Sequence, residues 1–263
     1  MYYAGCDIGS LTAKAVILDD NGILASSLIR VKGTALRSAS EVMDRVLENA
    51  GIRLDDIALC CSTGYGRFDI PFSDMHLTEI SCHGIGAHWL NDSVRTIIDI
   101  GGQDCKVISL DDRGLVAGFV MNDKCAAGTG RNLEILARAL NITIEELGPL
   151  ALQGGRSQSI ENTCSIFMEL EVLRMYYKKM PIPDIASSIT EAVARRVMAL
   201  TRSVPINDSV CITGGVSKNS AVVAMLETMI EKKFVGLSHD PQLAGAVGAA
   251  LYARQKSARE HVC

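Results

Sequence analysis

A sixteen-residue segment occurs twice in this chain of 263 residues, and the repeat constrains the fold more than any other feature. Residues 7–22 read DIGSLTAKAVILDDNG, and residues 99–114 read DIGGQDCKVISLDDRG. Apolar runs precede and follow each copy, and an Asn-Gly or Arg-Gly dipeptide at the end of each copy predicts a turn between strands. Each copy therefore predicts a three-stranded meander whose first turn carries Asp-Ile-Gly.

Similar elements follow the two copies in the same order. The first meander precedes a helix-patterned stretch at residues 35–49 and an apolar run at 57–61 that ends in Thr63-Gly64. The second precedes several helical patterns and then the run 209–212, which ends in Thr-Gly-Gly. This order predicts a duplicated α/β fold of two βββαβ halves around a cleft.

The second half is longer because helices are inserted into it. Apolar residues at helical spacing predict helices at 132–140, 164–180 and 185–204, with Pro183 at the start of the last one. We expect residues 1–92 to form the first half, joined by a C-terminal helix within 242–263, and residues 93–241 to form the second.

Composition excludes several classes of protein. Hydrophobic residues make up 48% and charged residues 21%, and no stretch approaches the roughly twenty apolar residues that a membrane span requires. The 26 basic and 30 acidic residues include no Lys/Arg cluster, which disfavours nucleic acid as a partner. The first residues lack the pattern of a secretory signal, so we expect a cytoplasmic protein.

The turns of the repeat predict phosphate binding. A glycine turn lets backbone N–H groups approach phosphate oxygens, and hydroxyls at Ser10 and Thr12 add donors. Asp7 and Asp99 would face one another across the cleft and hold Mg²⁺ through water, while Lys14 reaches a phosphate and Gln103 orients the attacking water. The catalytic candidates are Asp7, Asp99 and Gln103.

The other candidate nucleotide contacts come from both halves. Thr213-Gly214-Gly215 lies at a strand-to-helix turn that suits the adenosine side, and Glu134 and Gln242 would contact ribose or adenine or else lie solvated at the surface. No P-loop pattern and no G-x-G-x-x-G after the first strand is present. The full set of candidates is Gly9, Ser10, Leu11, Thr12, Ala13, Lys14, Gly101, Gly102, Gln103, Gly128, Gly130, Glu134, Gly214, Gly215, Val216 and Gln242.

The two hairpins and the Thr-Gly-Gly turn resemble the phosphate-1, phosphate-2 and adenosine motifs of the superfamily of acetate kinase, sugar kinases, heat-shock ATPases and actin. This resemblance spans nearly the whole chain and implies a duplicated ribonuclease H-like (actin-like ATPase) fold with ATP or ADP and Mg²⁺ as ligands. Turn-capping aspartates are the alternative explanation of each hairpin alone, but duplication of the complete hairpin disfavours it.

Two of the nine cysteines stand apart from the rest. Cys125 lies in a glycine-rich segment ahead of the helix predicted from residue 132, and Cys164 precedes another helix, with Asn162 or Thr163 as its N-cap. Helix N-termini favour a thiolate, the form of cysteine that binds metal. Two thiolates cannot complete a four-cysteine iron–sulfur shell, whereas a twofold dimer presents four. From the residues alone, a packing role for both cysteines stays open.

Five motifs resemble the ATP-dependent activators of 2-hydroxyacyl-CoA dehydratases, the BadF/BadG/BcrA/BcrD-type ATPases. They are NDKCAAGTGR, TGYGR, EISCHGIGA, DIGGQD and TGGV. The resemblance implies a homodimer in which the residues matching Cys125 and Cys164 hold one bridging [4Fe–4S] cluster. It further implies that ATP hydrolysis drives a low-potential electron to a partner iron–sulfur dehydratase or reductase, with ferredoxin or flavodoxin as the electron donor.

The chain departs from the family pattern at a few positions. Leu11 replaces a small polar residue in the first turn, and Met168 and Leu170 replace smaller side chains, which we expect near the acceptor-facing surface. The acceptor therefore stays open between a 2-hydroxyacyl-CoA dehydratase and a double-cubane cluster protein.

Two other functions remain as alternatives. One is a small-molecule kinase of the sugar-kinase superfamily, although no substrate-binding insertion of the expected size is present. The other is a filament-forming ATPase, which gives the two cysteines no role. Among the remaining candidates, His83 is predicted to make a packed polar contact, Cys60 and Cys61 to point to opposite faces of a strand, and Cys105 to lie in the core.

Overall fold

The computed structural model describes residues 1–122, 125–160 and 164–260. The chain divides into two compact units. Unit 1 comprises Met1–Arg95, Leu110–Ala117 and Gly236–Cys263, and unit 2 comprises Thr96–Ser109 and Gly118–Val235. Unit 1 contains the first copy of the repeat, and unit 2 contains residues 99–109 of the second copy.

Unit 1 is built on a five-stranded sheet with strand order β3-β2-β1-β4-β5. The first three strands are antiparallel, and β4 pairs with β1 in parallel. The elements are β1 (Tyr2–Ile8), β2 (Thr12–Asp19), β3 (Gly22–Arg30), α1 (Ala35–Ala50), η1 (Leu54–Asp56), β4 (Ile57–Thr63), η2 (Arg67–Asp69), β5 (Met75–His76), α2 (Glu79–Leu90), η5 (Pro241–Leu243) and α8 (Ala244–Glu260).

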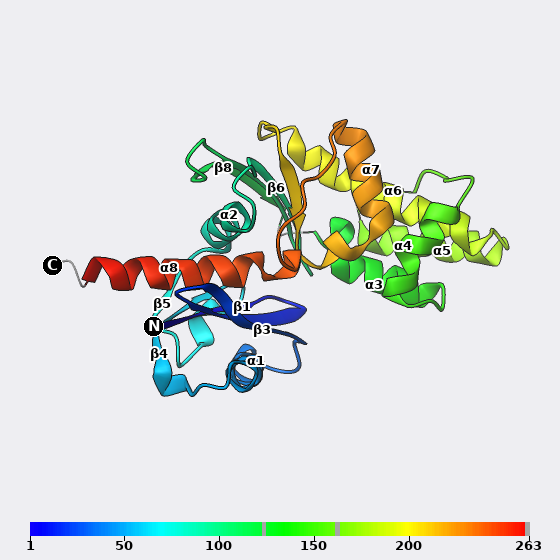
Figure 1. Ribbon diagram of the computed structural model, residues 1–263. Helices are drawn as coiled ribbons and strands as arrows, with labels where there is room; N and C mark the ends of the chain where they lie inside the picture. Colours follow the sequence, from blue (N-terminus) through cyan, green and yellow to red (C-terminus); the bar gives the residue numbers. More distant parts are fainter. Residues whose placement is uncertain (123–124, 161–163, 261–263) are drawn as a thin grey trace. The chain divides into compact units, whose positions relative to one another are not determined.

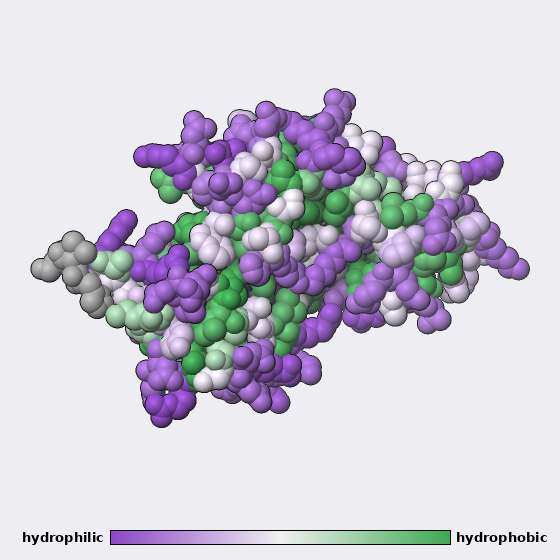
Figure 2. Space-filling view, viewed as in Figure 1, coloured by the Kyte–Doolittle hydropathy of each residue, from purple (hydrophilic) through white to green (hydrophobic). Residues whose placement is uncertain are grey.

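Helices cover both faces of the unit 1 sheet. Cys60 of β4 belongs to the apolar cluster with α1, whereas Cys61 packs with Cys82 of α2 and with α8, as strand alternation predicts. Figure 1 shows α1 and α8 on opposite sides of this sheet. In Figure 2 the outer surface over α1 is mainly hydrophilic, while hydrophobic residues show between α1 and α8.

Helices α2 and α8 touch each other backbone to backbone. A Cβ built on Gly248 of α8 would lie 1.8 Å from the carbonyl oxygen of Cys82, and one on Gly86 of α2 would lie 1.9 Å from that of Ala244. Only glycine permits so close an approach, which explains the small-residue composition of the final helix.

Unit 2 contains a four-stranded sheet with strand order β8-β7-β6-β9. Strand β7 is antiparallel to β6 and β9 is parallel to it, so the sheet repeats the arrangement of β2, β1 and β4. The elements are β6 (Thr96–Ile100), β7 (Cys105–Leu110), β8 (Val116–Asn122), η3 (Ala126–Gly128), α3 (Gly130–Ala139), α4 (Ile144–Gln153), α5 (Ser165–Tyr177), α6 (Ile182–Thr201), β9 (Val210–Thr213), η4 (Gly215–Lys218) and α7 (Ser220–Ile230).

The core of unit 2 joins its sheet to all five of its α-helices. Ile98 and Ile100 of β6 belong to one apolar cluster with residues of α3, α4, α5, α6 and α7. Cys105 is fully buried in this cluster, which confirms its prediction as a core residue. The predicted α/β fold with two meanders, each followed by helices and a parallel strand, is confirmed.

Two general properties concern the described part of the chain. None of its helices is both long enough and apolar enough to cross a membrane. None of its cysteines forms a disulfide.

Candidate functional site

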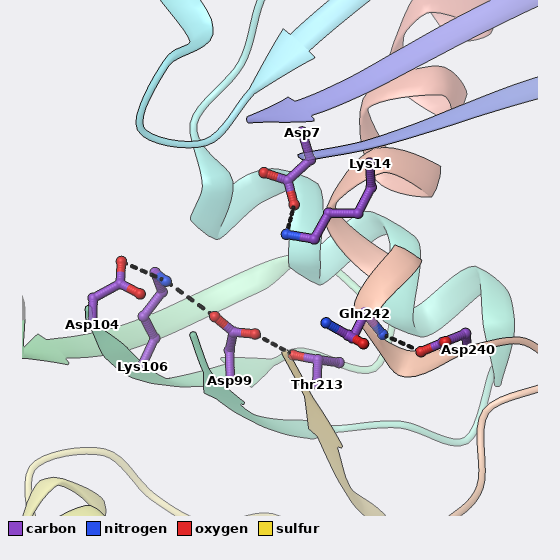
Figure 3. A network of polar contacts seen from close by, with 8 residues as sticks. All are labelled: Asp7, Lys14, Asp99, Asp104, Lys106, Thr213, Asp240 and Gln242. Carbon is purple, nitrogen blue, oxygen red and sulfur yellow. Dashed lines mark hydrogen bonds and ion pairs between the residues drawn. The ribbon is translucent and has the colours of Figure 1, made fainter. Parts of the chain in front are cut away.

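The first phosphate hairpin, defined as residues 7–14, joins β1 to β2. Asp7 and Lys14 are cross-strand partners, and Lys14 Nζ donates to Asp7 Oδ2 at 3.1 Å. Both side chains are buried, and the turn is closed by the Gly9 N–H, which donates to the Thr12 carbonyl at 3.0 Å. Figure 3 shows the two side chains directed at each other. The hairpin therefore presents a buried ion pair beneath a glycine turn.

The second phosphate hairpin, defined as residues 99–106, repeats this geometry in unit 2. Asp99 and Lys106 are cross-strand partners with an Nζ–Oδ2 distance of 3.0 Å, and the Gly101 N–H donates to the Asp104 carbonyl at 3.0 Å. Here the lysine contacts a second carboxylate, Asp104 Oδ2, also at 3.0 Å (Figure 3). Asp99 Oδ1 accepts a hydrogen bond from Thr213 Oγ1 at 2.8 Å. The carboxylate of Asp99 is thus held at both oxygens.

A Thr-Gly turn follows the parallel strand beside each hairpin. Gly64 and Gly214 have φ angles of 84° and 80°, in the region that favours glycine. A Cβ built on Gly64 would lie 2.5 Å from Asp7 Oδ1, and one built on Gly214 would lie 2.9 Å from Asp99 Oδ1. Each aspartate therefore packs against a glycine turn that leaves no room for a side chain.

The second phosphate hairpin is hydrogen-bonded to the start of α3. The backbone N–H groups of Gly130 and Arg131 donate to the carbonyls of Gly101 and Gly102, each at 2.9 Å. These N–H groups belong to the first turn of the helix and have no partner within it. A displacement of the hairpin would therefore act directly on α3.

The two candidate cluster cysteines are both half-buried, but they begin different kinds of helix. Cys164 is itself the N-cap residue of α5. The N-cap residues predicted from the sequence, Asn162 and Thr163, lie outside the described residues. Cys125 is the N-cap of the three-residue η3, and α3 begins at Gly130, two residues before the predicted start at residue 132. The helical conformation is interrupted between η3 and α3, where the N–H groups of Gly130 and Arg131 donate to the carbonyls of the hairpin.

Polar and sulfur contacts connect the segments that follow the two cysteines. Asn132 Nδ2 of α3 donates to the Ala127 carbonyl of η3 at 3.0 Å and contacts the Met168 Sδ of α5 at 3.3 Å. Asn122 Nδ2 donates to the carbonyl of Cys125 at 3.0 Å. The elements that carry Cys125 and Cys164 therefore belong to one packed assembly within unit 2.

The structure corrects the expected place of Met168. Its side chain is fully buried in the core of unit 2, whereas Leu170 is 54% exposed. Met168 faces α3 because it lies one helical turn after Cys164, on the inner side of α5. The exposed apolar residues near Cys164 are instead Ile166, Phe167 and Leu170.

Burial separates the remaining described cysteines from Cys125 and Cys164. The other six are buried, and burial raises the pKa of their thiols, to about 12 for Cys61 and Cys105. Thiols in this environment stay protonated at neutral pH and are poor metal ligands. Across the part of the chain that the structure describes, no three His, Cys, Asp or Glu side chains form a metal site.

The other predicted positions differ in their surroundings. Gln103 is exposed at the second turn, Ser10, Leu11 and Thr12 are half-buried at the first, and Gln242 is buried in η5. Glu134 forms ion pairs with Arg131 at 3.5 Å and Arg138 at 3.8 Å, so in this state its partners are neighbouring arginines. Thr213-Gly214 leads first into η4 and only then into α7, and Val216 is a core residue.

Two polar residues beside Asp99, Lys106 and Asp104, were not predicted from the sequence, and Thr213 was assigned to the adenosine side without its hydrogen bond to Asp99. Lys106 matches Lys14 in the repeat, so the constant offset could have identified it. Asp104 lies within the second copy, but the matching position of the first copy is Thr12, which gave no indication of a carboxylate. The hydrogen bond of Thr213 depends on the parallel pairing of β6 with β9.

Comparison with known proteins gives matches over nearly the whole chain. The (R)-2-hydroxyglutaryl-CoA dehydratase activating ATPase of Acidaminococcus fermentans is 40% identical, covering 98% of this chain and 99% of the relative. The structure of the 2-hydroxyisocaproyl-CoA dehydratase activator from Clostridium difficile, with bound ADPNP, is 38% identical with a TM-score of 0.94, covering 99% of this chain and 97% of that chain.

A more distant likeness concerns the fold alone. The glucokinase of Streptomyces griseus, at 16% identity, shares the fold with a TM-score of 0.56, and the match covers 97% of this chain and all of that chain. The model of the BadF/BadG/BcrA/BcrD ATPase family matches residues 4–253. With two matched phosphate hairpins and this match over most of its length, the chain belongs to the BadF/BadG/BcrA/BcrD ATPase family.

Proposed function

We propose that this protein hydrolyses ATP to drive electron transfer from a [4Fe–4S] cluster, shared between two copies of the chain, to a partner iron–sulfur enzyme. The partner is a 2-hydroxyacyl-CoA dehydratase or a related reductase such as a double-cubane cluster protein. The names of the relatives support a role as a dehydratase activator. Ferredoxin or flavodoxin is the proposed electron donor.

The hydrogen bonds between the second phosphate hairpin and α3 carry this proposal. They lead from the carbonyls of Gly101 and Gly102 to the N–H groups of Gly130 and Arg131, and α3 in turn contacts α5 through Asn132 and Met168. Cys125 and Cys164 precede these two helices. A change at the phosphates would therefore reach both cysteines through backbone and side-chain contacts of one unit.

We assign the nucleotide chemistry to the two hairpins. Asp7 and Asp99 bind the water shell of Mg²⁺, since Mg²⁺ retains several waters when carboxylates and phosphates hold it. Lys14 neutralises phosphate charge, and Gln103, which is exposed and close to Asp99 in sequence, orients the attacking water. The glycine turns bring backbone N–H groups to the phosphates.

The cysteine pair fits a shared cluster. Cys125 and Cys164 are half-buried, lie on elements that pack together, and supply two of the four thiolates that a [4Fe–4S] cluster takes. A twofold axis brings the same pair from the second copy. The cluster supplies the low-potential electron, and the protein supplies ligands that a nucleotide can move.

The test is anaerobic purification with cluster reconstitution, followed by iron analysis and EPR. We expect about one [4Fe–4S] cluster for every two chains. Cys125→Ala and Cys164→Ala should abolish iron binding and weaken the dimer, because two of four ligands are lost, while nucleotide affinity persists. Cys211→Ala, at a buried thiol of the same unit, is the matched control and should retain its iron. Iron retained in both ligand variants would contradict the proposed ligand set.

Hydrolysis separates this function from the kinase alternative. Asp99→Asn should impair ATP hydrolysis far more than iron binding. Phosphate transfer from ATP to a sugar or another small metabolite, at a rate above transfer to water, would favour the alternative of a small-molecule kinase, which the glucokinase-like fold allows.

A further inference from the structure

His83 of α2 is a buried titratable residue beside the first phosphate hairpin, with only 7% of its surface exposed. Its ring nitrogen Nε2 and the carboxylate of Asp7 approach the same point at the start of α8. A Cβ built on Gly245 would lie 2.9 Å from Asp7 Oδ2 and 3.2 Å from His83 Nε2. The two groups therefore lie on either side of the position that a side chain at Gly245 would occupy.

The partners of Asp7 differ from those of Asp99. Within the described residues, the side chain of Asp7 accepts its hydrogen bond from Lys14, at Oδ2. The threonine that pairs with Asp7 across the parallel strands, Thr63, donates to the Leu77 carbonyl at 2.9 Å instead. Asp99, by contrast, keeps Thr213 on one oxygen while Lys106 holds the other.

This difference has a consequence for nucleotide binding. If Lys14 turns from Asp7 to a phosphate, as its role under the proposed function requires, Asp7 Oδ2 loses its hydrogen bond while it remains buried. A buried carboxylate that loses a hydrogen bond is disfavoured, so a protein donor in addition to the Mg²⁺-bound waters would stabilise Asp7 in this state. Beside Gly245, His83 Nε2 is the polar atom placed to do so.

We propose that His83 is a positioning residue for Asp7. When Lys14 contacts phosphate, Nε2 of His83 donates a hydrogen bond to Asp7 Oδ2, directly or through one water, and holds the carboxylate toward the hydrated Mg²⁺. The inference rests on the nucleotide part of the proposed function and is independent of the cluster.

The test compares His83→Leu, which removes the donor, with His83→Gln, whose amide nitrogen can replace Nε2. Calorimetric titration measures the affinity for ADP with Mg²⁺ and with EDTA. We expect His83→Leu to lower the Mg·ADP affinity about ten- to a hundredfold, the effect of one hydrogen bond to a charged group, and to leave the affinity in EDTA unchanged. His83→Gln should restore most of the loss.

Gly245→Ala provides an independent variant, because its methyl group would enter the space between Asp7 and His83. It should also weaken Mg·ADP binding. Gly236→Ala is the matched control in the same unit, since a Cβ there meets nothing within 4 Å. It should bind Mg·ADP as the wild type does.

Two outcomes would overturn the inference. The first is wild-type Mg·ADP affinity in His83→Leu. The second is an equal loss in His83→Leu and His83→Gln together with a lower thermal midpoint in both, which would assign His83 a packing role. Failure of the cluster proposal would instead appear as absence of iron in the wild type, with the Mg²⁺-dependent effect of His83 unchanged.

Discussion

The two phosphate hairpins share a backbone and an ion pair but differ in what holds the aspartate. In the first, the side chain of Asp7 accepts a hydrogen bond from Lys14, and no other side chain among the described residues donates to it. In the second, Asp99 is bonded to Lys106 and Thr213, and Lys106 is also bonded to Asp104. The equivalent threonines therefore have different functions: Thr213 fixes an aspartate, whereas Thr63 fixes the backbone at Leu77.

The two copies of the repeat thus share a scaffold but differ in the surroundings of each hairpin. The second hairpin is fixed internally and is also attached to α3, so it can transmit displacement. The first hairpin has a lysine that a phosphate could attract without breaking a larger network. We expect the same substitution to have different effects in the two hairpins.

The largest difference should appear when each lysine is replaced by methionine. Lys106→Met leaves two carboxylates, one of them fully buried, without their cation, and should lower the free energy of unfolding by about 3–5 kcal/mol. Lys14→Met leaves one carboxylate and should cost about 1–3 kcal/mol. Urea denaturation of both variants measures the difference, and equal losses would show that Asp104 and Thr213 do not distinguish the hairpins.

A smaller difference should follow from replacing each threonine by valine, which has the same shape. Thr213→Val removes a hydrogen bond to Asp99 and should reduce the rate of ATP hydrolysis about tenfold or more, because the carboxylate loses its orientation. Thr63→Val should instead lower stability by about 1 kcal/mol and leave turnover near that of the wild type. Steady-state assays of ATP hydrolysis measure the turnover of both variants. A larger fall in turnover for Thr63→Val than for Thr213→Val would contradict the roles given to the two threonines.

The smallest expected difference concerns alkaline pH. Burial raises the pKa of the thiols of Cys6, Cys60, Cys61 and Cys82 in unit 1 and of Cys105 and Cys211 in unit 2. Below pH 9 these thiols are protonated in both the folded and the unfolded state. As pH rises from 9 toward 12, the thiols ionise in the unfolded state but not in the folded state, so the free energy of unfolding falls.

Unit 1 should therefore lose its structure first under alkaline conditions, because it contains four of these thiols and unit 2 contains two. Hydrogen exchange read by mass spectrometry at pH 9–11 would resolve the two units. Earlier exchange in the β6 and β9 region than in the β1 and β4 region would contradict this expectation.

Much of the fold could be predicted because the repeat fixes strand order and turn chemistry together. Lys106 follows from Lys14, and the strands on either side of each Asp-Ile-Gly turn follow from alternation. Helix α2 was harder to predict because its apolar residues, among them Ile80, Ile85 and Trp89, lie on all of its sides and leave no helical period. Pro149 within α4 obscured that helix in a similar way.

The details of the cysteine segments could not be predicted from local sequence. The break between η3 and α3 exists because Gly130 and Arg131 bind a hairpin about thirty residues earlier in the chain, and local propensity carries no information on that contact. The burial of Met168 depends on Asn132 and Ala127, whereas Ile166, Phe167 and Leu170 are equally apolar but exposed. A pattern of apolar residues does not say which of them face inward.

The packing of α8 on β1 has a consequence for synthesis of the chain. A Cβ on Gly5 would lie 2.0 Å from the carbonyl oxygen of Ala246, so the earliest strand is in direct contact with the last helix. The residues that cover this face of the first sheet leave the ribosome after all of unit 2. During translation, apolar side chains of β1 and β2 therefore stay exposed to solvent until α8 has been synthesised. A nascent chain stalled before residue 244 is a natural substrate for chaperones.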